Sequence, residues 1–187
     1  MEETPLVKGD IISGQTCISN KNMIHELEQK GYGEIEKEKL FLKQFETLYL
    51  LYAKRLILKK GNKQIDFNSF MSLSQKTNPE ILTKFLIYRD LRNRGYVVKD
   101  GFGFGSDFRV YERGDFGEKG AKFLIFGLNE GQKEKMGNLQ KKIEEITQMG
   151  KEPIIAVIER RGEIIYYKIN IMNFNENKAR LEESFQL

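Results

Sequence analysis

The apolar residues of this chain change their spacing at Gly95, and this change restricts the folds open to it more than any other feature of the sequence. Before it, Ile81, Phe85 and Tyr88 recur at four- and three-residue steps, which predicts a helix. After it, the apolar runs become short, rich in aromatic and β-branched residues, and bounded by glycines, which is typical of strands. We expect strands over three such runs: 96–99, 107–111 and 122–126.

The pattern then returns to a helix and ends in further strands. We expect a charged amphipathic helix over 132–149 and strands over 153–158 and 163–172. Leu139, Ile143 and Ile146 share one side of that helix and should be buried. Arg161-Gly162 predicts a tight turn between the last two strands.

The first half of the chain contains short strands and several helical patterns. We expect helices over 22–30 and 36–60, and a short one that begins near Asp66 with Phe67, Phe70 and Leu73 inward. Gly31 suits the left-handed position that ends a helix. In the longest pattern, Phe41, Phe45 and Leu48 recur at helical steps.

These elements predict two domains of different class. Residues 1–79 should form an α+β domain, and residues 80–187 an α/β domain around a mixed central sheet. The segment from about 173 onwards extends beyond the last predicted strand and forms a tail.

The composition excludes several kinds of site. Cys17 is the single cysteine of the 187 residues and His25 the single histidine, so an internal disulfide, a zinc site with several thiolates and a multi-histidine metal centre are excluded. We expect neither a metal nor a cofactor. The beginning of the chain lacks the pattern of a secretory signal, and no apolar run is long enough to span a membrane, so a cytoplasmic protein without a membrane partner is expected. The net charge of +4 permits a polyanionic partner without requiring one.

Two local patterns invite functional readings that the neighbouring residues disfavour. The glycine-rich run 101–105 is followed by a strand, whereas a dinucleotide-binding loop must open a helix. Asp107 on a strand invites comparison with a metal-dependent nuclease, but no Glu-x-Lys follows it closely. We interpret Asp107 as a structural partner of nearby arginines.

Two longer runs carry a family resemblance. Residues 85–99 read FLIYRDLRNRGYVVK, and residues 105–114 read GSDFRVYERG. They resemble the Y-x-D-L-R-x-R-G-Y helix end and the G-x-D-F-x-x-Y strand of the archaeal tRNA-splicing endonuclease family. The resemblance implies a restriction-endonuclease-like fold in the second domain. It also implies metal-independent RNA cleavage that leaves 2′,3′-cyclic phosphate and 5′-OH ends. In that reaction a tyrosine acts as base, a histidine as acid, and a lysine stabilises the anionic transition state.

Carried over by position, the resemblance places the tyrosine at Tyr111 and the lysine at Lys151. The histidine position falls on Gly120, and His25 lies in the other domain. Glu144 stands where an arginine that grips RNA is expected. We therefore interpret Tyr111 and Lys151 as retained family positions without a catalytic role.

The resemblance also implies an assembly. We expect the chain to be the structural subunit of a hetero-oligomer, with two copies of it, two of a catalytic subunit of the same family, and precursor tRNA as substrate. The predicted interfaces are the last strand, through Ile165 and Tyr167, and the loop before it, through Glu159 and Glu163. In the family this loop is acidic and enters a basic pocket of another subunit, whereas here it reads ERRGE.

Two alternatives remain open from the residues. The chain could be a self-sufficient homo-oligomeric endonuclease in which Lys119 or Lys122 replaces the histidine as acid. Lysine is a poor proton donor at neutral pH unless burial lowers its pKa. The chain could also be an RNA-binding module with no role in cleavage.

Overall fold

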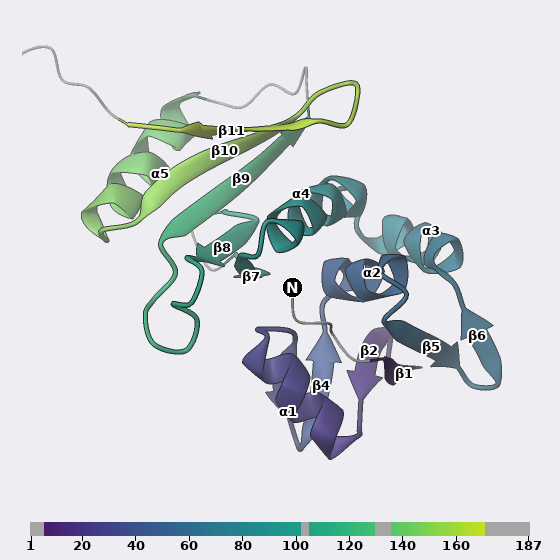
Figure 1. Cartoon of the computed structure of the whole chain (residues 1–187). Helices are drawn as coiled ribbons and strands as arrows, with labels where there is room; N and C mark the ends of the chain where they lie inside the picture. Colours follow the sequence, from purple (N-terminus) through teal and green to yellow (C-terminus); the bar gives the residue numbers. More distant parts are fainter. Residues whose placement is uncertain (1–5, 102–104, 130–135, 171–187) are drawn as a thin grey trace, which may run out of the picture.

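The structure is a computed structural model that describes residues 6–101, 105–129 and 136–170, and it contains two sheets with helices between and around them (Figure 1). The first unit is built from these elements: β1 (Val7–Ile12), β2 (Gln15–Ile18), α1 (Lys21–Gln29), β3 (Glu34–Glu36), β4 (Lys39–Leu42), α2 (Gln44–Tyr52), β5 (Leu56–Lys60), β6 (Lys63–Ile65) and α3 (Phe67–Thr77). Its sheet has the strand order β3-β4-β2-β1-β5-β6, in which β1 and β5 run parallel and the other neighbours antiparallel.

The second unit follows the predicted order of elements: α4 (Ile81–Asn93), β7 (Val97–Asp100), β8 (Phe108–Tyr111), β9 (Phe123–Asn129), α5 (Met136–Gln148), β10 (Glu152–Ile158) and β11 (Ile164–Lys168). Its sheet has the order β11-β10-β9-β8-β7. Only β9 and β10 run parallel among these strands, connected through α5. The expected mixed sheet is therefore confirmed, although with one parallel pair the unit is closer to α+β than to α/β.

The long helix predicted over 36–60 is wrong. Lys37 and Glu38 adopt left-handed conformations, with φ of 48° and 62°, and turn the chain from β3 into β4. The segment contains two strands and one short helix, α2, which ends before the left-handed Lys54. Leucines spaced two apart in β4 and in β5 are buried, so a period of two was mistaken there for a helical one.

The shorter helices of the first unit agree with the prediction. α1 ends before Gly31, whose φ is +76°. α3 begins after Asp66, and the Asp66 side chain accepts a hydrogen bond from the Ser69 amide at 2.8 Å. Within α3, Phe70 is buried as expected, but Leu73 is exposed, which contradicts its predicted inward position.

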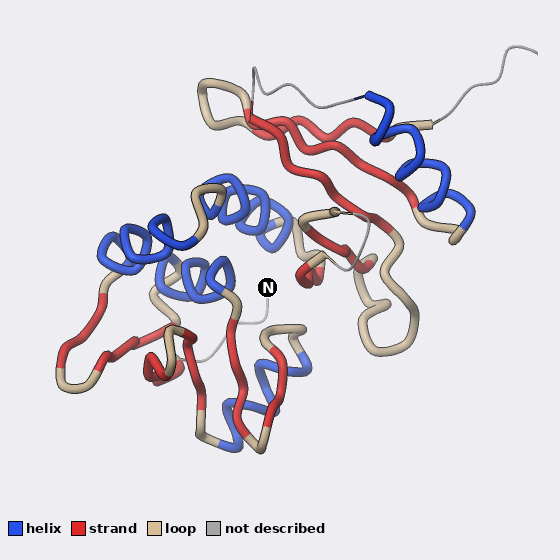
Figure 2. The backbone as a smooth tube through the Cα atoms, turned by 180° about the vertical axis from the view of Figure 1, so that it is seen from behind, coloured by secondary structure: helices blue, strands red, loops and turns tan. Residues whose placement is uncertain are grey.

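The two units share one core. The rings of Phe45, Tyr88 and Phe108 come from α2, α4 and β8, and their centroids lie 4.9 to 6.1 Å apart. The Arg92 guanidinium of α4 donates two 3.0 Å hydrogen bonds to the Lys30 carbonyl and lies 4.0 Å from the centre of the Tyr32 ring. These contacts hold the end of α1 against α4 of the second unit. Figure 2 shows the backbone of both units from behind.

On the second sheet, α5 packs one face through Ile143 and Ile146, both buried as predicted. The side chain of Leu139 and the part of the predicted helix before 136 lie outside the described residues. The last strand ends at Lys168, and residues 171–187, which include the predicted tail, also lie outside them. No helix among the described residues combines the length and the apolar character needed to cross a membrane.

Candidate functional site

Tyr111 lies at the end of β8, half-buried, and its register partner on β7 is Val97. Its ring meets the ring of Phe116 edge-on, with the centroids 5.0 Å apart. Phe116 in turn lies against Gly31 of the first unit, where a Cβ atom would come within 3.3 Å of the Phe116 ring. The Tyr111 ring is thus positioned by a stack of contacts that begins in the first unit.

Lys151 follows the end of α5, after Gly150, which has a φ of +68°. The Lys151 backbone amide donates to the carbonyl of Ile146 at 3.2 Å, as is common where a helix ends. The Lys151 ammonium donates to the carbonyl of Ala121 at 2.5 Å. The lysine therefore reaches across to the segment that leads into β9.

Gly120, where the resemblance places a histidine, lies next to Lys151. A Cβ atom built on Gly120 would be 3.8 Å from the Lys151 nitrogen, with no other described atom within 4 Å. The residue is exposed, so the position has room for a larger side chain. The structure thus brings positions 120 and 151 together.

The two lysines that flank Gly120 are engaged elsewhere. Lys119 forms an ion pair with Asp115 at 2.9 Å, and Lys122 one with Glu112 at 2.7 Å. The hydrogen bond to Glu112 raises the pKa of Lys122 above its usual value. A raised pKa makes Lys122 a weaker proton donor at neutral pH, and Lys119 is held in its ion pair with Asp115, so neither residue is placed as a substitute acid.

His25 lies away from Gly120, in the first unit, and Glu144 carries a negative charge where the family resemblance implies an arginine. His25 is exposed on α1 of the first unit, where its Nε2 lies 3.0 Å from the Gln29 amide nitrogen. Glu144 is exposed on α5 and accepts a hydrogen bond from Gln140 at 3.1 Å. Within the described residues, no three His, Cys, Asp or Glu side chains gather into a group that could hold a metal ion.

The predicted interface strand lies at one edge of the second sheet, beyond β10. Ile165 and Tyr167 point outward and are 37% and 51% exposed. The residue between them, Tyr166, points inward and donates a 2.8 Å hydrogen bond to Asp90 of α4. The outward face is therefore apolar at an open sheet edge, whereas the inward face belongs to the chain's own packing.

The loop before β11 is a hairpin turn closed by the backbone. The Glu159 amide donates to the carbonyl of Glu163 at 2.9 Å, and the Gly162 amide donates to the carbonyl of Glu159 at 2.8 Å. Gly162 has a φ of +80°, which confirms a turn at the expected place. Because backbone atoms form the turn, the side chains of Glu159 and Glu163 are not needed to hold it.

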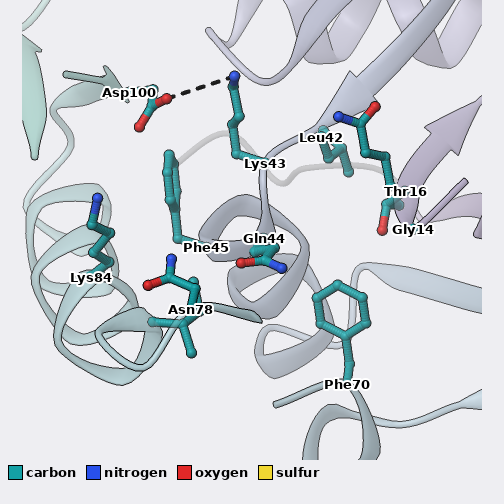
Figure 3. Close-up of a pocket in the computed structure, with 12 residues that line it drawn as sticks. Gly14, Thr16, Leu42, Lys43, Gln44, Phe45, Phe70, Asn78, Lys84 and Asp100 are labelled. Carbon is teal, nitrogen blue, oxygen red and sulfur yellow. Dashed lines mark ion pairs between the residues drawn. The ribbon is translucent and has the colours of Figure 1, made fainter. Parts of the chain in front are cut away.

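A cavity of about 320 Å³ between the two units was not predicted from the sequence. Figure 3 shows Lys43 of the β4–α2 connection and Lys84 of α4 on its walls, with Asp100 of β7 opposite. Lys43 lies 3.7 Å from Asp100, and Lys84 forms a 3.0 Å ion pair with Asp107. The cavity brings together two cations separated by forty residues of sequence, a proximity that no local pattern signals.

The partners of Asp107 correct its interpretation. Its carboxylate pairs with Lys84 and accepts a 2.8 Å hydrogen bond from the Gly127 amide, rather than binding arginines. Asp107 remains a structural residue, since it joins α4 to β8 and β9.

Comparisons with known proteins match both units of the chain to one family. The family profile of the tRNA intron endonuclease N-terminal domain matches residues 7–71, and that of the catalytic C-terminal domain matches residues 81–166. The tRNA-splicing endonuclease of Pyrococcus furiosus is 32% identical over 145 residues, covering 78% of this chain and 84% of that protein. Those of Methanococcus vannielii and Thermococcus onnurineus are each 31% identical, over 83% and 87% of this chain and 88% and 95% of theirs.

Proposed function

This chain belongs to the tRNA intron endonuclease family, and from that premise we propose that it is the structural subunit of a heteromeric enzyme that excises introns from precursor tRNA. In this proposal a catalytic subunit of the same family performs the cleavage. The products are a 2′,3′-cyclic phosphate and a 5′-OH end, as the family resemblance implies.

The observation that carries the proposal is Gly120 beside Lys151. The 5′ oxygen that leaves the phosphate must gain a proton, and glycine has no side chain to supply one. Lys119 and Lys122, the candidates on either side, are paired with carboxylates. The same pairing speaks against the alternative of a self-sufficient enzyme with a lysine as acid.

Tyr111 and Lys151 keep the family positions of the base and the lysine, as the resemblance implies. Tyrosine titrates near 10 and needs a nearby cation to act as a base at neutral pH. The Lys151 ammonium could stabilise a phosphorane anion, but here it donates to the Ala121 carbonyl. Without an acid, the two residues retain a scaffold role.

The assembly part of the proposal rests on two surfaces. Ile165 and Tyr167 offer an apolar strip at an open sheet edge, which suits burial against a second subunit. The loop before β11, with Glu159 and Glu163, is the second surface, and the family resemblance implies that such a loop enters a basic cavity of the partner. Because this chain's own loop carries Arg160 and Arg161 between its two glutamates, it is a poorer ligand for such a cavity than an acidic loop.

Reconstitution tests the proposal. The chain alone, a catalytic subunit from the same organism alone, and the two mixed are each incubated with an intron-containing tRNA in single turnover. We expect a defined hetero-oligomer that cleaves both splice sites, and no cleavage by this chain alone. Efficient cleavage by this chain alone, or no complex between the two, would refute the proposal.

A further inference from the structure

One segment of the first unit combines several basic residues with no acidic one. Residues 54–64 read KRLILKKGNKQ, with five basic residues and no acidic one. The five positive charges of this segment exceed the net charge of +4 of the whole chain, so the rest of the chain is close to neutral. The segment begins just after α2 and contains strand β5, a turn at Gly61-Asn62 and the first residues of β6.

The hairpin places its lysines around one protruding tip. Lys59, Lys60 and Lys63 are all exposed, and Lys60 and Lys63 stand directly opposite each other in the strand register. Lys59 neighbours Lys60 in β5 and so points to the other face of the sheet. Both faces of the tip therefore carry positive charge.

These charges are not balanced within the chain. Within the described residues no ion pair joins Lys59, Lys60 or Lys63 to a carboxylate, although Asp10 faces Lys59 in the β1–β5 register. Like charges directly opposite across two strands destabilise a sheet. The hairpin thus keeps an arrangement that is unfavourable for the isolated fold, and a polyanion would relieve it.

The place of the hairpin separates it from the family's cleavage positions. Figures 1 and 2 both show β5 and β6 projecting from the end of the first unit that lies farthest from β8 and β9. Tyr111 ends β8, and Gly120 and Ala121 precede β9. An RNA held at the hairpin is therefore contacted away from these family positions of the chain.

We propose that the β5–β6 hairpin binds the phosphate backbone of the body of precursor tRNA through Lys59, Lys60 and Lys63. This inference rests on the proposed function for the identity of the RNA. Lysines at a hairpin tip act as point charges that position RNA without reading its sequence. The hairpin would supply affinity for the folded tRNA, and the subunit faces near β8 and β9 would meet the intron.

The test compares two triple variants of the full chain with the same charge change. One is Lys59→Gln, Lys60→Gln, Lys63→Gln, and the control is Lys21→Gln, Lys37→Gln, Lys39→Gln, whose lysines are also exposed in the first unit. Two RNA probes are titrated across salt: an intron-containing precursor tRNA, and a short RNA that contains only the two splice sites and their stems.

For the hairpin variant we expect binding of the precursor tRNA to weaken about tenfold or more at low salt, with the slope of log K against log salt smaller by about 2. The short RNA should bind the hairpin variant and the unmodified chain with affinities within about twofold of each other, because it has no tRNA body for the hairpin to contact. The control variant should bind both RNAs within about twofold of the unmodified chain, because its hairpin is intact.

Four outcomes would overturn the inference. An unchanged slope means that the hairpin does not touch RNA. Equal losses in both triple variants mean a non-specific charge effect. If the hairpin variant binds RNA normally but does not assemble with the catalytic subunit, the hairpin is a protein-binding surface. If it behaves normally in both assays, the lysines only protect the sheet edge from aggregation. If the hairpin slope changes as expected but the reconstituted complex never cleaves, the proposed function fails while the RNA-binding surface stands.

Discussion

Two surfaces of the second unit differ in how their side chains are used. Around Gly120, Lys119 and Lys122 are each paired with a carboxylate, and Lys151 with a backbone carbonyl. Along β11, Ile165 and Tyr167 point outward at a sheet edge with no partner in the described part of the chain. The first surface is satisfied internally, whereas the second presents apolar side chains that nothing in the described part of the chain covers. This contrast supports the proposal that the chain contributes to assembly rather than to chemistry.

The largest expected effect comes from making the β11 edge charged. Ile165→Lys with Tyr167→Lys should abolish the hetero-oligomer, because association would bury unpaired ammonium groups. The unmodified chain alone should self-associate through the same apolar strip. Light scattering measures both states.

Ile35→Lys with Leu82→Lys is the matched control, since these residues are comparably exposed apolar side chains away from β11. A complex that survives the β11 change, or that is lost equally in the control, would remove this edge from the interface.

The second-largest effect is expected from adding a general acid at position 120. Gly120→His should place an imidazole beside Lys151, and a general acid is typically worth about 10²–10⁴-fold in rate. Cleavage is measured in a complex whose catalytic subunit has lost its own histidine, so that any activity belongs to this chain. We expect a gain of about a hundredfold or more over that background.

Gly120→Gln fills the same space without titrating and should give no gain. If the histidine variant assembles normally and stays inactive, the missing acid is not what silences this surface.

A smaller effect is expected at the loop before β11. Glu159→Lys with Glu163→Lys should weaken association about fivefold to tenfold at low salt and less at high salt, since salt screens exposed charges. Analytical ultracentrifugation at several salt concentrations gives the dissociation constants. Glu28→Lys with Glu118→Lys, both exposed elsewhere, serves as the control. A loss independent of salt would argue against an electrostatic contact.

The smallest effect concerns the pairing of Lys122. Glu112→Gln replaces the carboxylate that pairs with Lys122 by a neutral amide, so the pKa of Lys122 should fall toward the ordinary value for lysine. NMR titration of the lysine side chains detects the shift, with Glu145→Gln, next to Lys141, as the control. Splicing by the complex should not change. A Lys122 pKa that does not move would show that the ion pair is absent in solution.

The second unit was largely predictable from its sequence because its signals are local. Helix 81–93 follows a 3.6-residue period and ends at Gly95, and the strands after it are bounded by glycines. The helix predicted over 36–60 is wrong because Lys37 and Glu38 form a left-handed turn, although neither residue type is typical of such turns. Sequence patterns carry little information on such turns when glycine and asparagine are absent.

The candidate site was predictable only in part. Tyr111 and Lys151 could be placed by the family motifs, but the short approach of Lys151 to position 120 depends on how α5 packs on the sheet. The cavity between Lys43 and Lys84 depends on the docking of α2 against α4, which is set by the core around Tyr88. Contacts between distant segments of this kind are fixed by tertiary packing and leave no local periodicity.

The most direct test of the central claim, that this chain assembles the enzyme without cutting, is single-turnover cleavage of an intron-containing tRNA by reconstituted complexes. Tyr111→Phe together with Lys151→Ala in this chain should leave the rate close to wild type, provided that light scattering shows an intact complex. Removal of the catalytic subunit's histidine should lower the rate about 10²–10⁴-fold. A hundredfold loss from the double change in this chain, with assembly intact, would contradict the claim and show that Tyr111 and Lys151 take part in the reaction.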